Sequence, residues 1–384
     1  MPDLRVAVLH HWFVTQGGGE RVAECLAALL PSADVYTLLH RPEGVPSSLR
    51  HRPLRASFLQ RIPGAVHRHR EAMPFYPEAA RSLDLRGYDL VVSSDSGPVK
   101  GARILPSTPH LCYCHSPMRY LFDGFESYRA SMNRVKRAVF SLAACRVRSA
   151  DRAAAQQVTQ FVANSQYVQQ RIRENYGRSA LVIHPPIDLH LARENRPGQA
   201  YLAVGRLVGY KRTDVLIEAC NRLGRPLRIV GTGPEERRLR KGAGPTITFL
   251  GSLPQQQLWD EYSRCRALLF AADEDFGMVP LEAQSCGRPV IAYGVGGSLE
   301  TVRGHGGADR TGMFFPQQTA DSLMEAILHF EGVEGSFSPA ACLANAARFA
   351  TPRFLDAVRA AILEMMPAAE CVLADVNAAM HVVS

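Results

Sequence analysis

Short apolar runs alternate with longer amphipathic stretches along the whole chain. Runs of strand length occur at residues 4–10, 33–39, 88–95, 110–116, 160–165, 180–186, 200–207, 226–233, 247–253, 266–272 and 289–294. Helical patterns at residues 20–30 and 213–223 each follow an apolar run and a turn. Because buried strands separated by helices form parallel sheets covered on both faces, the pattern predicts an α/β fold.

The alternation stops once, in a segment rich in proline and charge, and then restarts. At 384 residues the chain exceeds the usual size of one hydrophobic core, so two domains are expected. We predict an N-terminal domain over 1–186, a linker over 187–198 and a C-terminal domain over 199–350. A helix over 351–366 is expected to cross back to the N-terminal domain, and residues 367–384 form a tail of unassigned role. Open parallel sheets bind ligands at the carboxyl ends of their strands, so the site is expected between the domains.

Composition places the chain among ordinary globular proteins. Hydrophobic residues make up 46% and charged residues 21%, unlike the values of disordered or fibrous proteins. No apolar run approaches the ~18–20 residues that a membrane-spanning helix needs, and the first residues lack a signal-peptide pattern. The nine cysteines show neither a CxxC pair nor a zinc-binding spacing, which indicates free thiols. These features together predict a cytoplasmic protein.

The net charge is +8, and basic side chains cluster in one stretch. Residues 50–70 hold six arginines and three histidines, no acid, and interleaved apolar residues. A basic, partly amphipathic stretch of this kind suits an anionic membrane surface, and a solvated helix face is the alternative. We therefore predict peripheral contact with the inner face of the cell membrane. Nucleic acid is not an expected partner, because the recognised nucleic-acid motifs are missing.

Two features of the first half are candidates for ligand contact. The turn Gly17-Gly18-Gly19 precedes a helical pattern, where backbone N–H groups and the helix dipole can meet an anion. The spacings of dinucleotide-binding domains and of P-loops are absent, and a tight turn without a ligand explains the same glycines. His115 ends another apolar run, where a structural role and a catalytic role are both open.

Two cations follow the first apolar run of the second half. Arg206 and Lys211 lie between that run and a helical pattern that begins near Thr213. At the carboxyl end of a strand they could hold a diphosphate without a metal ion. Solvated surface charges are the alternative interpretation of the same residues.

Two glutamates eight positions apart stand in the stretch EDFGMVPLE, residues 274–282. Pro280 fits the first position of a helix, so Glu282 would lie in the first turn, where the helix dipole favours a carboxylate. Helix capping therefore explains Glu282 on local grounds. Glu274 lies in the preceding loop beside Phe276-Gly277, where a carboxylate and backbone N–H groups can meet a ligand.

In this order the motifs resemble glycosyltransferase family 4, a family of retaining enzymes. Its fold, GT-B, consists of two Rossmann-like α/β domains that face each other across a cleft. The most specific landmark is the E-x7-E motif formed by Glu274 and Glu282, and VGRL, FVANSQYV, IHPPID and FLGSLP are further ones. The resemblance extends from Val6 to about Phe354. The stretch CYCHSPMRYLFD is similar to a branch that contains many O-antigen and exopolysaccharide mannosyltransferases.

The resemblance implies a role for each candidate residue. Arg206 and Lys211 would neutralise the donor diphosphate as the glycosidic bond breaks. Glu274 would hydrogen-bond hydroxyls of the donor sugar, and Glu282 those of the ribose. The other implied contacts are Gly17, Gly18 and Gly19 near the diphosphate and acceptor, His115 near the transferred sugar, Gly251 and Leu253 near the base, and the Phe276-Gly277 backbone near the sugar.

The resemblance also implies a reaction. A hexose would pass from a nucleotide-diphosphate sugar to a lipid-linked or saccharide acceptor in cell-surface polysaccharide or glycolipid synthesis, without a metal ion or cofactor. The branch favours GDP-mannose as donor, and a UDP-hexose is the alternative. A GT-B enzyme of another reaction type and a non-catalytic basic protein that binds nucleic acid or anionic lipid also stay open. A non-catalytic binding protein would leave the glutamate motif without a role.

Overall fold

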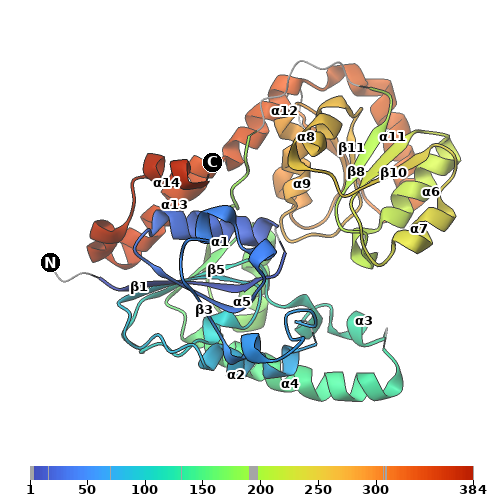
Figure 1. Cartoon of the computed structure of the whole chain (residues 1–384). Helices are drawn as coiled ribbons and strands as arrows, with labels where there is room; N and C mark the ends of the chain where they lie inside the picture. The colour runs from blue at the N-terminus through green and yellow to red at the C-terminus, as the bar shows by residue number, and fades with distance from the viewer. Residues whose placement is uncertain are drawn as a thin grey trace. The chain divides into compact units, whose positions relative to one another are not determined.

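The computed structural model of the chain divides into two compact units (Figure 1). The structure describes residues 4–15, 17–69, 71–130, 132–189, 198–305, 307 and 309–383. The first unit comprises residues 1–186 and 351–384, and the second comprises residues 187–350. Each unit contains one parallel sheet with helices packed against it, so the predicted α/β class is confirmed.

The sheet of the first unit has seven strands in the order β3-β2-β1-β4-β5-β6-β7, all paired in parallel. The strands are β1 (Val6–Phe13), β2 (Asp34–His40), β3 (Leu54–Ala56), β4 (Leu90–Asp95), β5 (His110–Cys114), β6 (Gln160–Ala163) and β7 (Ala180–Val182). The central strands are buried along their whole length, which accounts for their continuous apolar character.

Helices cover both faces of this sheet. They are α1 (Gly18–Leu29), α2 (Tyr76–Arg81), α3 (Phe125–Ala130), α4 (Arg134–Gln156), α5 (Gln166–Tyr176), α13 (Thr351–Met365) and α14 (Val376–Val383). Within β1, Val6 and Val8 face the core formed with α1, α13 and α14, while Ala7 and Leu9 face the core formed with α2 and α4. Figure 1 shows these two groups of helices on opposite sides of the sheet.

The C-terminal segment, residues 351–383, belongs to the first unit. Helix α13 and the 3-10 turn η10 (Pro367–Val372) lead to α14, which lies against α1. The Arg21 guanidinium donates to Val383 O at 2.6 Å, and Ala374 N donates to Leu29 O at 2.9 Å. The tail that had no assigned role in the sequence therefore covers an apolar face of α1.

The sheet of the second unit has six parallel strands in the order β10-β9-β8-β11-β12-β13. They are β8 (Tyr201–Val204), β9 (Leu227–Val230), β10 (Ile247–Gly251), β11 (Leu268–Phe270), β12 (Val290–Tyr293) and β13 (Gly312–Phe315). The helices are α6 (Thr213–Leu223), α7 (Glu236–Gly242), α8 (Gln255–Arg264), α9 (Met278–Ser285), α10 (Ser298–Thr301), α11 (Ala320–Val333) and α12 (Pro339–Ala346). The predicted bounds of α6 coincide with the observed ones.

Short 3-10 turns complete both units. They are η1 (Pro42–Gly44), η2 (Ser47–Leu49), η3 (Phe58–Arg61), η4 (Met73–Phe75), η5 (Val99–Gly101), η6 (Arg119–Leu121), η7 (Gly209–Lys211), η8 (Glu334–Ser336) and η9 (Ala347–Phe349). Several of them stand where the sequence pattern shows neither helical nor strand periodicity, because three-residue turns leave no periodic signal.

The basic stretch at residues 50–70 is not a helix. Its described residues form β3, η3 and turns, and Leu59 lies in the core at 1% exposure. Pro53 and Pro63 explain the difference, because each lacks a backbone donor and interrupts helical hydrogen bonding. Arg70 lies outside the described residues. The solvated helix face considered for this stretch is therefore wrong.

The second unit begins at Ile187, the first residue of the predicted linker, 187–198. Ile187 is 2% exposed and donates its backbone N–H to Phe349 O at 3.0 Å. It packs in a small core with Phe276 and Leu281. Residues 190–197 of the predicted linker lie outside the described residues.

Candidate functional site

Candidate residues of the second unit lie where its strand order reverses. The sheet places β8 beside β11, and the connections from these neighbours run to opposite sides. Arg206 and Lys211 follow β8, and Glu274 follows β11. Open parallel sheets bind ligands in the crevice at such a switch point. The strand order thus explains how two motifs more than sixty residues apart come together.

An ion pair joins the two loops at this crevice. The Lys211 ammonium donates to Glu274 Oε1, and the two side chains are 15% and 18% exposed. Arg206 and Lys211 also line one small cavity of about 20 Å³ beside Phe270. Because an ammonium can exchange a carboxylate for a phosphate oxygen, this arrangement can receive a diphosphate.

The Glu274 loop is held by the turn Gly296-Gly297. Gly297 N donates to Glu274 O at 2.8 Å, and Glu274 pairs with Gly296 in an isolated parallel bridge. A Cβ atom added to Gly297 would lie 2.2 Å from Phe276 Cα, and Gly296 has a φ of 66°. Side chains cannot be accommodated at such distances from backbone atoms, so the glycines fix the position of Glu274.

Replacing Gly297 with alanine is expected to displace the Glu274 loop. The added methyl group overlaps the Phe276 backbone, which cannot yield as a flexible side chain would. We expect donor affinity to fall at least about tenfold, measured by calorimetric titration with nucleotide sugar. Gly242→Ala is the matched control, because nothing lies within 4 Å of a Cβ at that position. Equal affinities in the two variants would show that the loop does not depend on this approach.

Glu282 lies deeper in α9 than expected. The helix begins at Met278, so Glu282 falls beyond the first turn and no acidic residue occupies that turn. Gly277, with a φ of 84°, allows the helix to start two residues before Pro280. Helix capping as the explanation of Glu282 is therefore wrong.

A buried tyrosine holds Glu282 instead. The Tyr262 hydroxyl, on a fully buried side chain, donates to Glu282 Oε2 at 2.5 Å. Burial raises the pKa of Glu282, and the hydrogen bond from Tyr262 and the charge of Lys211 oppose that rise. A carboxylate has a second oxygen, so Glu282 can accept a further hydrogen bond. Tyr262 was not singled out in the sequence, because a lone tyrosine inside an amphipathic helix gives no signal.

The remaining candidate residues of the donor side differ in how deeply they are buried. The Phe276 ring is 3% exposed and packs on Phe349 with ring centroids 5.6 Å apart, which leaves only its backbone to meet a ligand. Gly251 ends β10 with a φ of 69°, and its carbonyl accepts from Gly231 N at 2.7 Å. Leu253 is half-buried against the neighbouring core. The predicted contact of these two residues with a base stays a prediction.

Candidate residues of the first unit also lie at a switch point. The sheet places β1 beside β4, and His10, His11 and Ser94 lie toward the carboxyl ends of these strands. Ser94 Oγ is 3.0 Å from His10 Nδ1 and 2.7 Å from His115 Nε2. A Cβ on Gly19 would lie 3.6–3.8 Å from all three imidazole rings. The structure thus brings His115 and the glycine turn together, while their predicted contacts with donor and acceptor stay predictions.

The three imidazoles are neutral at neutral pH. Burial lowers the pKa of His11 to about 4 and that of His115 to about 3, and it lowers the pKa of His10 well below its usual value. The neighbouring histidines repel a proton further. Since a serine hydroxyl has one proton and two acceptor lone pairs, at most one of His10 and His115 accepts from Ser94, and at least one of them donates to it. The cluster can therefore bind a hydroxyl but offers no full positive charge to an anion.

Glu20, in the first turn of α1, is a functional candidate that sequence reasoning missed. It is 7% exposed, and burial raises the pKa of its carboxyl group to about 7. Thr15 Oγ1 lies 3.5 Å from its Oε1, a long hydrogen bond. The signal available in the sequence was an acid directly after three glycines. A carboxyl group that titrates near neutrality beside a glycine turn is suited to meet an acceptor hydroxyl.

The variant Glu20→Gln is expected to be more stable than the parent at pH 8 by about 1–3 kcal/mol. When folding raises the pKa of a carboxyl group, the stability that the group contributes is fully present below its pKa in the unfolded protein, about 4.3. This stability is lost as pH rises through the pKa of the group in the folded protein. The difference between variant and parent should therefore vanish near pH 4 and grow up to about pH 7. Chemical denaturation at pH 4, 6 and 8 measures it.

Two comparisons make this test specific. The histidines have depressed pKa values, so the stability that they contribute is lost as pH falls below about 6.5, opposite to the direction expected for Glu20. This contribution is the same in Glu20→Gln and in the parent, so it cancels in the difference. Glu174→Gln, at an exposed carboxyl, is the matched control. A pH-independent difference for Glu20→Gln would contradict burial as the cause of the raised pKa.

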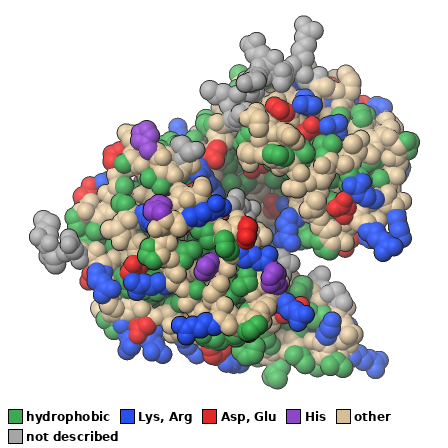
Figure 2. All heavy atoms as spheres, viewed as in Figure 1, with side chains coloured by type: hydrophobic (Ala, Val, Ile, Leu, Met, Phe, Trp, Pro, Cys, Tyr) green, Lys and Arg blue, Asp and Glu red, His purple; other side chains and the backbone are tan. Residues whose placement is uncertain are grey.

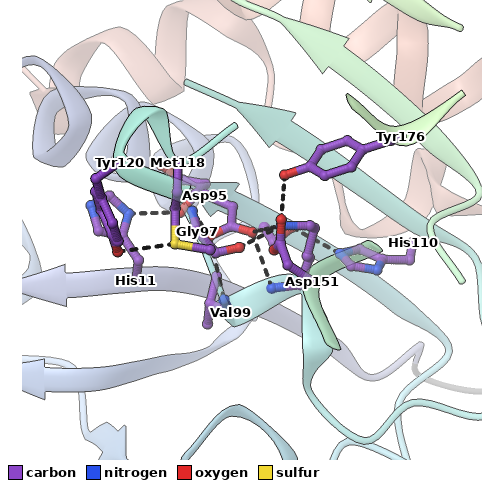
Figure 3. A network of polar contacts seen from close by, with 12 residues as sticks. His11, Asp95, Gly97, Val99, His110, Met118, Tyr120, Asp151 and Tyr176 are labelled. Atoms are coloured by element: carbon purple, nitrogen blue, oxygen red, sulfur yellow. Dashed lines mark hydrogen bonds and ion pairs between the residues drawn. The ribbon is translucent and has the colours of Figure 1, made fainter. Parts of the chain in front are cut away.

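A buried charge network supports the end of β4, which carries Ser94 and lies beside His115. The Lys100 ammonium, 1% exposed, pairs with Asp95 at 3.4 Å and with Asp151. Figure 3 shows Asp95 and Asp151 facing each other, with the Tyr176 hydroxyl directed at Asp151, to which it donates at 2.6 Å. Asp95 also accepts from the backbone of Gly97 at 2.8 Å, and its own carbonyl accepts from His115 N at 2.8 Å. The network therefore fixes the end of β4 and, through it, the histidine cluster.

Within the part of the chain that the structure describes, no group of three or more His, Cys, Asp and Glu residues is arranged to hold a metal ion. The predicted independence from metal stays a prediction. Among the same residues, no helix has the length and apolar character needed to cross a bilayer.

Both units match known protein domains. Residues 16–191 match the domain described as Glycosyltransferase Family 4, and residues 198–331 match the domain described as Glycosyl transferases group 1. The chain carries two glycosyltransferase domains of the GT-B type. The two domains agree with the family that the E-x7-E motif and its neighbours indicate, and the predicted fold is confirmed. The retaining mechanism and the mannosyltransferase branch stay predictions.

Solved structures have the same fold. HepE of Anabaena, in complex with UDP, has a TM-score of 0.71 at 16% identity over 94% of this chain and 100% of that chain. Sucrose-phosphate synthase of Thermosynechococcus elongatus has a TM-score of 0.71 at 20% identity over 95% and 100%. At these identities the likeness establishes the fold, two Rossmann-like α/β domains.

Curated relatives match over shorter regions. D-inositol 3-phosphate glycosyltransferase of Mycobacteroides abscessus is 28% identical over 201 residues, 46% of this chain and 44% of that protein. An uncharacterized glycosyltransferase of Methanocaldococcus jannaschii is 28% identical over 143 residues, 36% and 41% of the two chains. The matches thus span less than half the length of these relatives.

Proposed function

We propose that the protein is a retaining hexosyltransferase that uses a nucleotide-diphosphate sugar. The acceptor would be a lipid-linked molecule or a saccharide in cell-surface polysaccharide or glycolipid synthesis. The observation that carries the proposal is the Lys211–Glu274 ion pair at the β8–β11 switch point. Glu282, which accepts a hydrogen bond from the Tyr262 hydroxyl, follows Glu274 by eight residues. This combination supplies a cation for a diphosphate and two carboxylates for hydroxyl groups at one crevice.

On the donor side, Lys211 and Arg206 would bind the diphosphate oxygens. The bond between the anomeric carbon and the diphosphate oxygen breaks, and the negative charge that develops on the leaving oxygen is stabilised by the two cations. Glu274 would then hydrogen-bond the sugar and Glu282 the ribose. The Glu274 carboxylate changes partner from Lys211 to hydroxyl groups when the donor binds, which leaves the Lys211 ammonium to the phosphate.

On the acceptor side, the histidine cluster and Glu20 would bind the attacking hydroxyl. The acceptor oxygen forms its bond to the anomeric carbon on the face that the diphosphate leaves, so the configuration is retained. The departing phosphate oxygen takes the hydroxyl proton, and the step therefore needs neither a metal ion nor a separate base. Neutral imidazoles at Ser94 suit this role, because they can donate to and accept from a hydroxyl.

The donor is proposed to be GDP-mannose, with a UDP-hexose as the alternative. The similarity to the mannosyltransferase branch favours the first. Structures of Anabaena HepE with UDP and with UDP-glucose favour the second, because they show that this fold accepts a uridine donor. The D-inositol 3-phosphate glycosyltransferases among the relatives make a phosphorylated polyol a further acceptor to test.

A thermal-shift panel of GDP, UDP and ADP sugars tests the proposal. A ligand that binds only the folded protein at a hundredfold excess over its Kd adds about 2.7 kcal/mol of stability. We expect a shift with one nucleotide class and its loss in Glu274→Ala. Product analysis with a radiolabelled donor then separates a new glycoside from free sugar or sugar phosphate. Absence of a shift with every nucleotide sugar, and equal behaviour of Glu274→Ala and parent, would refute the proposal.

The place of action is proposed to be the cytoplasmic face of the cell membrane. A lipid-linked acceptor resides in the bilayer, while a nucleotide sugar is a soluble cytoplasmic metabolite, so the reaction joins the two at the membrane surface. The net charge of +8 supports contact with anionic lipid.

A further inference from the structure

The exposed half of α4 carries an unpartnered apolar stripe. The second half of the helix packs on the core through Ala144, Val147 and Ala155. The first half instead places Val135, Val139 and Leu142 in solvent, with exposed fractions of 74%, 63% and 78%. These are the three largest exposures among the described large hydrophobic side chains. Such a row of aliphatic side chains in water calls for a physical explanation.

The three side chains lie on one line of the helix. Their spacing of four and three residues repeats the helical period, so they share one face and extend over about 10 Å of its length. The opposite face holds Phe140, whose ring stacks on Phe125 of α3 with centroids 5.7 Å apart. The helix therefore stays in place through its other face, and the apolar stripe is not needed for folding.

Basic residues border the stripe on both sides. Arg134 and Lys136, both exposed, stand one position before and after Val135, about 100° to either side of it around the helix. The segment from Arg134 to Arg148, both included, holds five basic residues and no acid. In Figure 2, hydrophobic side chains gather with Lys and Arg at the lower right, where Figure 1 shows α3 and the start of α4.

We propose that this face of α4 docks the first unit on an anionic phospholipid bilayer. An apolar stripe flanked by cations is the pattern of a helix that lies in the membrane interface, with its apolar side chains among the acyl chains and its cations at the headgroups. The charge complementarity favours anionic lipid over a second copy of this basic chain. Three aliphatic side chains also cover far less than the ~1,000 Å² that a specific protein interface requires.

The surface replaces the one expected from the sequence. In the basic stretch at residues 50–70, the exposed apolar side chains are Phe58 at 38% and Ile62 at 44%, while Leu59 is buried. Its prolines prevent the continuous helix that such docking requires. The inference deepens the proposed membrane contact and does not rest on the identity of the donor sugar.

Vesicle flotation of the full chain tests the inference. Binding is measured to vesicles of phosphatidylcholine alone and to equimolar phosphatidylcholine and phosphatidylglycerol, at 0.15 M salt. The parent should bind the anionic vesicles, and the triple variant Val135→Ser, Val139→Ser, Leu142→Ser should bind at least about tenfold more weakly. Arg134→Glu with Lys136→Glu should lose the preference for anionic lipid.

Two control variants separate this surface from others. Leu328→Ser with Val382→Ser changes aliphatic side chains that are 51% and 46% exposed elsewhere, and should bind as the parent does. Phe58→Ser with Ile62→Ser tests the basic stretch, and should also bind as the parent does. Circular dichroism confirms that each variant is folded.

Three outcomes would overturn the inference. These are a parent that does not bind anionic vesicles, a triple variant that binds as the parent does, and a concentration-dependent dimer that the triple variant abolishes. Nucleotide-sugar binding is followed in the same proteins by thermal shift and should be unchanged in the triple variant. Vesicle binding without any nucleotide-sugar binding would refute the proposed function and leave the docking surface intact.

Discussion

Replacing Lys211 with methionine is expected to lower kcat/KM for glycosyl transfer by about a hundred- to thousandfold. Methionine keeps the length of the side chain and removes its charge, so the variant lacks one of the two cations that are proposed to stabilise the leaving diphosphate. Because this stabilisation is greatest when the bond breaks, the loss should appear mainly in kcat. Steady-state kinetics with the donor that shifts the melting temperature measure both constants.

The partner carboxylate decides how the loss arises. Glu274 pairs with Lys211 in the free protein, so removing the cation also leaves a partly buried carboxylate without its ion pair. The cycle of Lys211→Met, Glu274→Gln and the double variant separates two roles. If Glu274 only positions Lys211, the double variant is no worse than Lys211→Met alone. If Glu274 binds the sugar itself, as proposed, the two losses multiply.

Lys241→Met is the matched control for this cycle, because that lysine is exposed on α7 in the same unit. It should retain the activity of the parent protein. An unchanged kcat/KM in Lys211→Met would remove Lys211 from the leaving-group site. A loss confined to KM would show that the cation binds donor and transition state equally.

The place of the donor-side candidates in the fold can be predicted from the sequence because each has a local signature. Arg206 and Lys211 stand directly after an apolar run, and Glu274 stands directly after another. Parallel strands bring such positions to one sheet edge, whatever the details of packing. What the sequence does not show is which strands are neighbours, and the Lys211–Glu274 pair depends on β8 lying beside β11.

Helix boundaries and long-range partners are the features that sequence reasoning missed. Proline favours the first helical turn, so the sequence predicts that α9 starts at Pro280. The left-handed conformation of Gly277 instead lets the helix start at Met278. Tyr262 and Glu282 meet only in the fold, twenty residues apart. Tertiary contacts of this kind leave no periodic signal, and the same holds for the short strands β3 and β13.

The acceptor side was predicted less completely for a related reason. His115 and the glycine turn are candidates from the sequence, but Ser94, which joins His115 to His10 from a different strand, gives no local signal. Glu20 becomes a candidate through burial, which no local pattern reports. The docking surface that we propose lies on α4 and not on residues 50–70, because exposure and not composition decides which apolar residues are available.

Replacing Lys100 with methionine is expected to destabilise the first unit by about 3–5 kcal/mol. Lys100 lies between Asp95 and Asp151, and all three side chains are 1–4% exposed. Removing the ammonium leaves two buried carboxylates facing each other without a counter-charge. Although burial favours neutral groups, the charge of Lys100 lowers the pKa of Asp95 in the parent. In the variant, no positive charge stabilises the ionised carboxylate of Asp95.

The destabilisation should depend on pH in a defined direction. Without Lys100, burial raises the pKa of the two carboxyl groups in the folded variant above the unfolded value of about 3.9. A raised folded pKa means that stability is present at low pH and lost as pH rises. The deficit relative to the parent should therefore be smaller at pH 5 than at pH 8.

Urea unfolding of the whole chain can report on this unit alone. The chain has two tryptophans, Trp12 in the first unit and Trp259 in the second. In a Trp259→Phe background, the fluorescence of Trp12 follows only the unit that contains Lys100. Arg103→Met, at an exposed cation of the same unit, is the matched control and should cost little.

Neutralising one carboxylate should restore part of the lost stability. In Lys100→Met with Asp151→Asn, only Asp95 carries a buried charge, and Asp95 keeps its hydrogen bonds from Gly97, Val99 and the backbone of residue 100. The asparagine also keeps an acceptor for the Tyr176 hydroxyl. If the double variant is no more stable than Lys100→Met, or if Lys100→Met costs no more than Arg103→Met, the network does not stabilise the unit through its charges. Recovery in the double variant would show that the ammonium serves to balance the two carboxylates that fix the end of β4, and with it His115.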